Sequence, residues 1–353
     1  MLLFLDQEHD LHAEWVEAEC QRREVPYLRL CTERFPLQVQ ISTWLEAGRM
    51  TGRIQTTEQE IRLEEIVGVW YRRPEEPELH PEMPDGYREF ARSECVSNLV
   101  GLYQALYDRR WVSRYDRVLG ANHKIFQMRL AGEMGFSTAP TLITNDPDDT
   151  RRFFEQCGGR MIYKPMRFEL ITDEEGSEYG IYTSIVTEEH IERCLESVSV
   201  VPCLFQSLVD KSYELRVNVI GDRVWSAAIH SQESESTQLD FRLDAENLRH
   251  EPIHLSEELE ALCLEMTHRL GLRMSNIDFI VTPEGDHVFL ELNPNGQFAW
   301  IEDLTGLPLT TALVDELLGV DTLADHPYLK HRSLSFEPQT AYKERASRER
   351  QTA

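Results

Sequence analysis

The sequence predicts a mixed α/β or α+β protein built from more than one domain. Short apolar runs alternate along the chain with longer segments of helical periodicity, and this alternation is typical of folds in which helices pack against sheets. The 353 residues suffice for two or three domains with buried cores. With 41% hydrophobic and 28% charged residues, the composition is that of a globular protein.

Composition also excludes several classes of function. The chain carries 36 Lys and Arg against 62 Asp and Glu, a net charge of −26, so its field opposes binding to nucleic acid. No apolar run approaches the roughly 18 residues of a membrane-spanning helix. The segment 1–6 lacks a basic region and a cleavage site, and the seven cysteines include no CxxC pair. We therefore expect a cytoplasmic protein whose thiols are buried and reduced.

Residues 1–118 are expected to form an N-terminal α/β domain. Apolar runs predict three strands, at residues 2–5, 27–31 and 66–71. A helix around Trp15 connects the first two strands. A second helix is predicted over residues 90–106, because apolar side chains recur there with helical spacing at positions 99, 102, 103 and 106.

Residues 119–205 are expected to form a central subdomain. Along the chain the pattern predicts a helix after Ala121, an extended stretch at 137–143, a helix capped by Asn145 or Asp146, and a buried strand at 161–165. The acidic segment 168–180 is poor in strand signals and is interpreted as a mobile loop. Thr187 then caps a helix whose apolar face carries Ile191, Cys194, Leu195 and Val198.

Residues 206–328 are expected to form a C-terminal subdomain. A hairpin at 215–229 turns at Gly221-Asp222, which places Glu214, Arg216 and Asn218 on one polar face. Ser256 caps a following helix that ends before Gly271. Residues 329–353 are polar and are expected to be a disordered tail.

A last hairpin concentrates the chemistry. Strands at 276–281 and 287–293 flank the connection 283–286, and this loop length pairs residue 281 with 288 and residue 278 with 291. Asp278, Glu291 and Asn293 then converge as three oxygen ligands, a set that suits Mg²⁺ carrying nucleotide phosphates. The alternative interpretation is that all three are outward residues of a solvated antiparallel face.

The order of polar residues along the chain resembles the signature of ATP-grasp ligases, which place ATP and Mg²⁺ between two α+β subdomains. The series is Lys124, Lys164, Gln206-Ser207-Leu208, Glu214-Leu215-Arg216, Asp240-Phe241-Arg242, Asp278 and Glu291-Leu292-Asn293. Within that superfamily, the segments 69–74, 240–242 and 290–300 are similar to the peptide maturases of microviridin-type graspetides. The resemblance implies an ATP-grasp fold preceded by an N-terminal α/β domain, and it extends to about residue 328.

The resemblance also implies a role for each matching residue. Lys124 and Lys164 match the lysines that hold ATP phosphates, Gln206, Ser207 and Leu208 match the linker that faces adenine, and Glu214 matches the ribose contact. Asp278, Glu291 and Asn293 match the magnesium ligands, and Arg216 and Arg242 match arginines beside the transferred phosphate and the acyl phosphate. The family further implies recognition of a leader segment and often a homodimer.

The expected function is therefore ATP-dependent macrocyclisation of a ribosomal precursor peptide. Its Asp or Glu side chains would be activated as acyl phosphates and joined to Ser or Thr as esters, or to Lys as amides. Two alternatives remain open: a ligase that adds free amino acids to a protein or small molecule, and a nucleotide-binding peptide scaffold without catalysis. Arg72 and Arg73 either hold an acidic peptide or bind surface carboxylates. Lys164 is expected to serve ATP binding and chemistry, whereas Lys211 is expected to be a surface lysine.

Overall fold

The computed structural model describes residues 1–167, 170–172 and 178–330. Most of the predicted C-terminal tail lies outside the described residues. Only its first two residues are described, and they end the short helix α10 (Pro327–Lys330). Among the described helices, none has both the length and the apolar character needed to cross a membrane.

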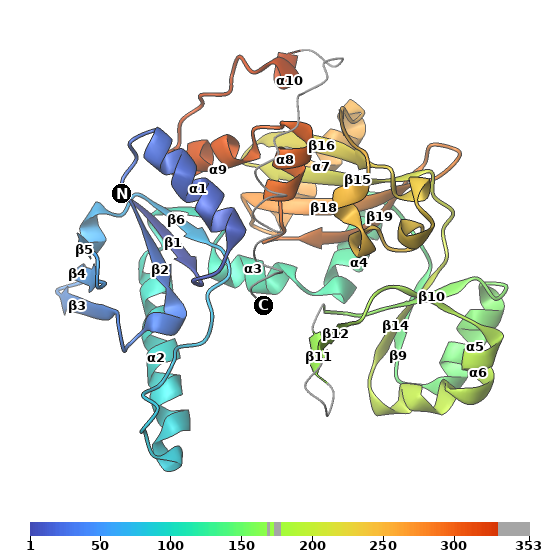
Figure 1. Ribbon diagram of the computed structural model, residues 1–353, viewed down its shortest axis with the longest axis horizontal. Helices are drawn as coiled ribbons and strands as arrows, with labels where there is room; N and C mark the ends of the chain where they lie inside the picture. Colours follow the sequence, from blue (N-terminus) through green and yellow to red (C-terminus); the bar gives the residue numbers. More distant parts are fainter. Residues whose placement is uncertain (168–169, 173–177, 331–353) are drawn as a thin grey trace.

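Four parallel strands form the main sheet of the N-terminal domain, in the order β2-β1-β6-β7 (Figure 1). They are β1 (Leu2–Asp6), β2 (Tyr27–Cys31), β6 (Gly68–Tyr71) and β7 (Arg110–Val112). β1 is buried along its whole length because a parallel sheet is covered on both faces. The covering helices are α1 (Leu11–Arg22) and α2 (Asp85–Ala105). The predicted strands and both helices are confirmed, with α2 beginning earlier than residue 90.

A second, antiparallel sheet in this domain escaped prediction. It consists of β3 (Gln40–Glu46), β4 (Arg49–Gln55) and β5 (Glu60–Arg62). β3 has no buried residue, so its sequence lacks the apolar run that signals a strand. Ala47 and Gly48 connect β3 to β4 with φ of 50° and 79°, the positive pair that a tight hairpin turn requires.

The central subdomain contains a four-stranded sheet in the order β13-β10-β14-β9. The strands are β9 (Thr141–Thr144), β10 (Met161–Lys164), β13 (Ser184–Val186) and β14 (Cys203–Ser207), and the adjacent helices are α5 (Pro147–Gln156) and α6 (Glu188–Arg193). Asp146 caps α5 and Thr187 caps α6, as predicted. The expected burial of Cys194 is wrong, because α6 ends at Arg193 and the exposed Cys194 begins a tighter 3₁₀ turn.

The acidic segment 168–180 is not free of strands, so that interpretation is corrected. β11 (Leu170–Thr172) and β12 (Glu178–Gly180) pair antiparallel. Leu170 and Ile171 supply an apolar, strand-forming start that the acidic composition of the segment obscured. Residues 173–177 lie outside the described residues, so the mobility of the segment stays a prediction.

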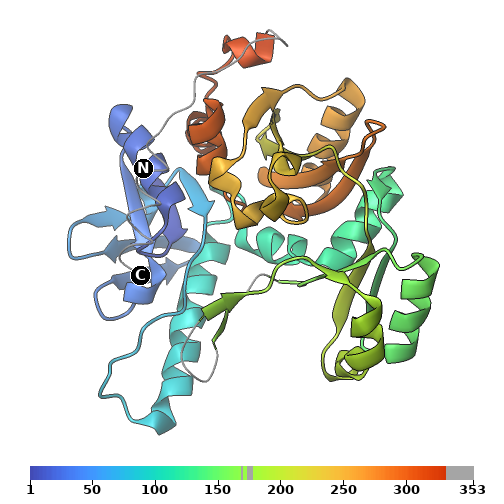
Figure 2. The same cartoon turned by 45° about the vertical axis from the view of Figure 1, so that its right-hand side comes forward.

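The C-terminal subdomain is built on a six-stranded sheet in the order β17-β16-β15-β18-β19-β8. The strands are β8 (Ser137–Thr138), β15 (Tyr213–Ile220), β16 (Arg223–Ile229), β17 (His250–Ile253), β18 (Met274–Val281) and β19 (His287–Asn293). The helices packed on it are α3 (Tyr115–Ala121), α4 (Lys124–Met134), α7 (Glu257–Arg269), α8 (Ala299–Thr305) and α9 (Leu309–Leu318). Figure 2 shows α3 and α4 running between the N-terminal domain and the central subdomain.

The two faces of the six-stranded sheet pack against different partners. One face buries Val217 and Phe279 with α3, α4 and α7. On the other, Trp225 and Ile229 pack with α8 and α9 and also with Phe4 of the N-terminal sheet. This second core joins the N-terminal domain to the C-terminal subdomain.

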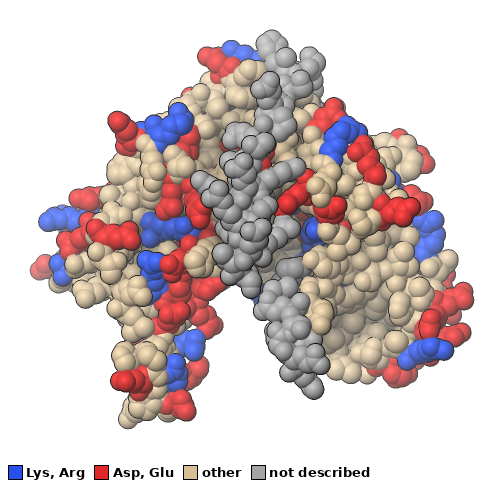
Figure 3. All heavy atoms as spheres, viewed as in Figure 1, with Lys and Arg blue, Asp and Glu red and all other residues tan. Residues whose placement is uncertain are grey.

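The visible surface mixes acidic and basic side chains (Figure 3).

Candidate active site

Asp278, Glu291 and Asn293 lie together on the paired strands β18 and β19, as the hairpin pattern predicts. Asp278 faces Glu291 across the strands. The Asn293 amide nitrogen lies 3.3 Å from Asp278 Oδ2 and 3.3 Å from Glu291 Oε1. The three side chains therefore present a compact set of two carboxylates and one amide.

A β-bulge sets this register. Phe279 pairs with Phe289, but Asp278 pairs with Glu291, so Leu290 is an extra residue on β19. The predicted pairing of 278 with 291 is confirmed. The predicted pairing of 281 with 288 is wrong, because the register at the turn is shifted by one residue and Val281 faces His287.

Arg216 reaches the carboxylate set from the neighbouring strand β15. Its Nη1 lies 2.8 and 2.7 Å from the two oxygens of Asp278, and its Nη2 donates to the carbonyl of Gln297 at 2.9 Å. Burial raises the pKa of Asp278, and the charge of Arg216 opposes that rise. Arg216 is therefore fixed by Asp278 on one side and by the segment after β19 on the other.

Two lysines lower the pKa of Glu291, and one of them contacts it. Lys124, the first residue of α4, places Nζ 2.9 Å from Glu291 Oε2 and donates to the Pro165 carbonyl at 3.0 Å. Burial alone would raise the pKa of Glu291, but the charges of Lys124 and Lys164 hold it well below its usual value. Burial also lowers the pKa of Lys164, which ends β10. One lysine thus begins a helix on the six-stranded sheet, the other ends a strand of the four-stranded sheet, and both lower the pKa of one carboxylate.

Lys211 is nearly buried beside the same site, so its assignment as a surface lysine is wrong. Its side chain is 9% exposed, and Nζ lies 2.6 Å from Glu214 Oε1 and 3.1 Å from the Leu239 carbonyl. Burial raises the pKa of Glu214, and Lys211 opposes the rise. The turn before β15 directs Lys211 inward because Glu214, three residues later, is itself buried.

The scarcity of lysine would have revealed Lys211. The chain has five lysines among its 36 basic residues, at positions 124, 164, 211, 330 and 343. In a chain whose cationic side chains are almost all arginine, a lysine indicates a specific role. Its compact ammonium suits a buried charge or a phosphate. Three of the four lysines in the described part of the chain lie at this site.

Arg242 lies on a 3₁₀ turn between β16 and β17, and its side chain is held by Asp240. Nε and Nη2 donate to the two carboxylate oxygens at 2.8 and 2.5 Å, and the guanidinium lies 5.9 Å from the ring centroid of Tyr182. Burial would raise the pKa of Asp240, but these hydrogen bonds hold it below its usual value. The charges of Arg242 and Glu291 influence each other, so Arg242 borders the same site.

Gln206, Ser207 and Leu208 lie where β14 ends. The Gln206 side chain is buried and donates to Thr141 Oγ1 at 2.9 Å. The backbone N–H groups of Ser207 and Leu208 donate to the carbonyls of Pro140 and Arg160 at 3.0 and 2.8 Å. Because these two N–H groups are already bonded, a base bound here would contact carbonyl oxygens, unless the backbone hydrogen bonds of Ser207 and Leu208 open.

Arg72 is not placed to hold a peptide, which corrects that expectation. Its side chain is 1% exposed and binds Asp10 and the carbonyl of Asn295 at 3.1 and 2.6 Å. Arg73, by contrast, is exposed. Sequence analysis also missed Asp10 and His12, because both stand inside an ordinary helix start.

The carboxylate set fits magnesium in its chemistry. Among the described residues, no group of three His, Cys, Asp or Glu side chains could hold a metal. Asp278 and Glu291 offer only two carboxylates, and Asn293 would add an amide oxygen once its amide turned over. Mg²⁺ usually takes one or two carboxylates and completes its octahedron with phosphate and water oxygens, so this short set suits it.

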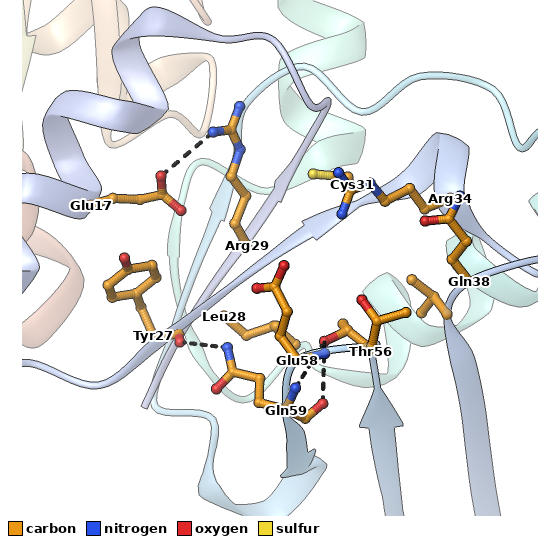
Figure 4. Close-up of a pocket in the computed structure, with 12 residues that line it drawn as sticks. Glu17, Tyr27, Leu28, Arg29, Cys31, Arg34, Gln38, Thr56, Glu58 and Gln59 are labelled. Carbon is orange, nitrogen blue, oxygen red and sulfur yellow. Dashed lines mark hydrogen bonds and ion pairs between the residues drawn. The ribbon is translucent and has the colours of Figure 1, made fainter.

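A separate cavity of about 180 Å³ lies in the N-terminal domain (Figure 4). The cavity lies between the edge strand β2 and the turn 56–59. Gln59 Nε2 connects these two elements by donating to the Tyr27 carbonyl at 3.3 Å. Glu17, Glu58, Arg29 and Arg34 line it together with uncharged residues. None of the predicted site residues lines this cavity.

Comparison with known families identifies the chain. Residues 121–317 match the family described as the RimK-like ATP-grasp domain. The chain belongs to this ATP-grasp family. Residues 2–119 match the family described as the MvdD pre-ATP grasp domain, so the fold implied by the resemblance is confirmed. This protein is an ATP-grasp ligase.

Solved structures of peptide-modifying ATP-grasp ligases are similar over nearly the whole protein. A RiPP-associated ATP-grasp ligase from Chryseobacterium gregarium, in complex with ADP and a leader and core peptide, is 27% identical, with a TM-score of 0.83 over 90% of this chain and 96% of that one. The macrocyclase MdnC from Microcystis aeruginosa MRC, bound with its precursor peptide MdnA, is 27% identical, with a TM-score of 0.79 over 90% and 99%. MdnB from the same organism is 31% identical, with a TM-score of 0.74 over 90% and 98%. Comparison with curated proteins gives no match.

Proposed function

We propose that this ATP-grasp ligase macrocyclises a ribosomally made precursor peptide. It would activate Asp or Glu side chains with ATP and join them to Ser or Thr as esters, or to Lys as amides. One observation carries the proposal: Lys124 contacts Glu291, whose pKa Lys164 also lowers, beside the pair of Arg216 and Asp278, in a protein similar to peptide ligases.

The cations of the site answer the main chemical obstacle. A carboxylate is a poor electrophile, so it must first take the γ-phosphoryl group of ATP and become an acyl phosphate, with ADP leaving. Lys124 and Lys164 would neutralise the phosphate oxygens before transfer, and Arg216 and Arg242 would stabilise the charge on the transferring group. The attacking hydroxyl or amine then displaces phosphate and loses a proton.

Asp278, Glu291 and Asn293 would hold the magnesium ion. When bound, Mg²⁺ neutralises phosphate charge and orients the phosphoryl group. Lys124 and Arg216 now pair with these carboxylates at 2.9 and 2.7 Å. In the loaded site we expect both cations to turn toward phosphate oxygens, since the carboxylates would then hold the metal.

The nucleoside is assigned to the neighbouring strand ends. Gln206, Ser207 and Leu208 would face adenine, and Glu214 would contact the ribose. Glu214 is buried and held by Lys211, which supports a fixed acceptor for ribose hydroxyls. We place the N-terminal domain at residues 1–118 and the two subdomains at 119–205 and 206–328, with α4 and β8 of the segment 119–205 packed on the sheet of the C-terminal subdomain.

The proposed partner is a precursor peptide with a leader segment. Relatives solved with leader, core or precursor peptides support this choice. Arg73, exposed at the end of β6, is the remaining candidate from the Arg72-Arg73 pair for contact with acidic core residues. A homodimer, implied by the family resemblance, is part of the same proposal, and sedimentation would test it.

Mass balance tests the proposed reaction. The purified protein is incubated with ATP, Mg²⁺ and the short peptide encoded beside its gene, and the products are analysed by mass spectrometry. Each intramolecular link removes one water, so we expect successive losses of water that match ADP release. Mild alkaline hydrolysis should restore the mass if the links are esters and leave it unchanged if they are amides.

Other outcomes would contradict the proposal. A mass gain that depends on an added free amino acid would indicate an amino-acid ligase. ADP release without a mass change, or nucleotide binding without turnover, would indicate an uncoupled or scaffolding protein. The variant Glu291→Ala serves as control, because it should abolish both ADP release and water loss if the assigned site is responsible.

A further inference from the structure

The segment from Asn293 to Ala299, which follows β19, is clamped by the N-terminal domain. It begins with a proposed metal ligand and ends at the start of α8. We infer that Arg72 and His12 of the N-terminal domain are positioning residues that hold this segment, and through it Asn293 and Arg216, in the geometry that binds the metal–nucleotide complex. This inference rests on the proposed function, since it assigns a purpose to that same site.

Arg72 forms the first half of the clamp. Its Nη1 donates to the carbonyl of Asn295 at 2.6 Å, and the Asn295 side chain donates back to the carbonyl of Arg72 at 2.8 Å. Asp10 fixes the guanidinium, accepting from Nε at 3.1 Å, and caps α1 through the N–H of Ala13 at 2.9 Å. Arg72 is 1% exposed, so these charge-assisted bonds form away from water, where they hold geometry well.

His12 forms the second half. Its Nδ1 accepts from the backbone N–H groups of Phe298 and Ala299 at 3.3 and 3.1 Å. Burial and the nearby charge of Arg72 hold the pKa of His12 well below its usual value, so the ring stays neutral and Nδ1 keeps its lone pair. His12 therefore anchors the segment at its far end.

The clamped segment is tied directly to the site. Arg216 donates to the carbonyl of Gln297 at 2.9 Å while it holds Asp278 with its other nitrogen. A Cβ at Gly296 would overlap the side chain of Asn276, so the backbone there lies directly on the six-stranded sheet. Displacement of the segment would consequently move Arg216 and the end of β19 together.

Groups that hold a metal ligand in position have a measurable influence on metal binding. Removing a group that orients a metal ligand typically weakens metal binding by about 10- to 100-fold. Arg72 and His12 touch neither ATP nor metal in the proposed arrangement. Their loss should therefore weaken binding of the metal much more than binding of the nucleotide alone.

The test measures binding rather than turnover. Mn²⁺ replaces Mg²⁺, and electron paramagnetic resonance follows free Mn²⁺ during titration of the full chain with saturating ADP. The variants are Arg72→Gln, His12→Phe and His12→Asn, because the Asn oxygen can replace Nδ1 as acceptor. Arg129→Gln is the control, since Arg129 is 79% exposed and pairs with Glu133 on α4.

We expect Arg72→Gln and His12→Phe to raise the half-saturating Mn²⁺ concentration by about tenfold or more. His12→Asn and Arg129→Gln should stay within about twofold of wild type, and ADP affinity without metal should change little in every variant. Unchanged Mn²⁺ binding in folded Arg72→Gln and His12→Phe would overturn the inference. Loss of cooperative unfolding in both would also overturn it, because the clamp would then serve folding. If wild type itself binds no Mn²⁺ with ADP, the proposed function fails instead.

Discussion

Lys211 and Lys164 show how differently two lysines of one site are held. Lys211 is paired with the buried Glu214 at 2.6 Å, whereas no hydrogen bond or ion pair joins Lys164 Nζ to another described residue. Removing one partner of a buried pair leaves an uncompensated charge, which costs about 3–5 kcal/mol. We therefore expect Lys211→Met to destabilise the protein by roughly that amount.

Lys164→Met should have little effect on stability. Burial disfavours the Lys164 ammonium more than the charge of Glu291 favours it, so its removal should leave unfolding stability nearly unchanged while ATP turnover is lost. Urea unfolding and ADP release, measured on both variants, separate the two effects. Lys330→Met is the surface control, and equal stability losses in Lys164→Met and Lys211→Met would show that the pairing is misassigned.

Asp6 predicts a pH dependence of stability at the C-terminal end of β1. Burial and the neighbouring Asp10 raise its pKa from 3.8 to about 7, against the attraction of Arg29 at 3.1 Å. The folded state therefore holds a proton that the unfolded chain loses near pH 4. This contribution is complete below that pH and is lost as the pH rises toward 7.

Asp6→Asn should accordingly flatten the decline of the unfolding free energy between about pH 4 and pH 7. Urea unfolding at several pH values measures the slope. Part of the decline should persist, because burial also raises the pKa of Glu302 to about 7. An unchanged slope in Asp6→Asn would mean that Asp6 is ionised in the folded protein at neutral pH.

At the scale of elements, sequence patterns predicted many of the strands and helices that bury an apolar face, although the buried β7, α8 and α9 were not predicted. β1, β15 and β18 carry such runs, and α7 carries its cap Ser256 as well. The exposed β3 has no such signal, so its whole sheet was missed. Local patterns report burial, and an element held mainly by cross-strand pairing leaves little trace in them.

The site was predictable where it follows strand periodicity and not where it depends on contacts between distant segments. Asp278 and Glu291 pair as predicted because a one-residue shift of register at the turn and the bulge offset each other. Arg72 was misjudged because its partner Asn295 lies 223 residues away, and nothing in its immediate neighbourhood indicates that contact. Lys211, by contrast, pairs with Glu214 only three residues later, a pairing that was available in the sequence and was overlooked.

The bulge at Leu290 leads to a prediction for the hairpin. Leu290 and Glu291 both lie on the site side of β19, while Phe289 and Leu292 face the core. Deleting Leu290 keeps core and polar residues on their faces but removes the local bend. We expect the deletion variant to fold and to lose activity by about 100-fold, because a 1 Å displacement of a catalytic group costs that much.

Leu290→Ala is the matched control for the deletion. It keeps the residue count and the bulge, and it removes only part of a half-buried side chain, so its ATP turnover should remain within about threefold of wild type. Circular dichroism and ADP release are measured on both. A fully active deletion variant would show that the bend is irrelevant to the position of Glu291.

At the scale of the whole molecule, the N-terminal domain and the C-terminal subdomain share one core. Phe4 and Trp70 of the N-terminal sheet pack with Phe298 and the apolar residues of α8 and α9. A chain beginning at residue 119 would expose that face of α8 and α9 to water. We expect such a fragment to show no cooperative unfolding transition, since an apolar face of this kind needs a partner.

Trp70 tests the shared core within the full chain. Its side chain is 1% exposed and lies between the N-terminal sheet and Phe298, with a ring separation of 6.4 Å. Truncating a buried Trp leaves a cavity, so Trp70→Ala should cost about 3–5 kcal/mol of unfolding free energy. Trp44→Ala is the control, because Trp44 is 56% exposed near the tip of the β3–β4 hairpin and should change stability by less than about 0.5 kcal/mol. If the two domains were independent, Trp70→Ala would lower only a first of two unfolding transitions. A single transition that shifts as a whole, seen by both circular dichroism and ADP binding, is the expected result because one core serves both.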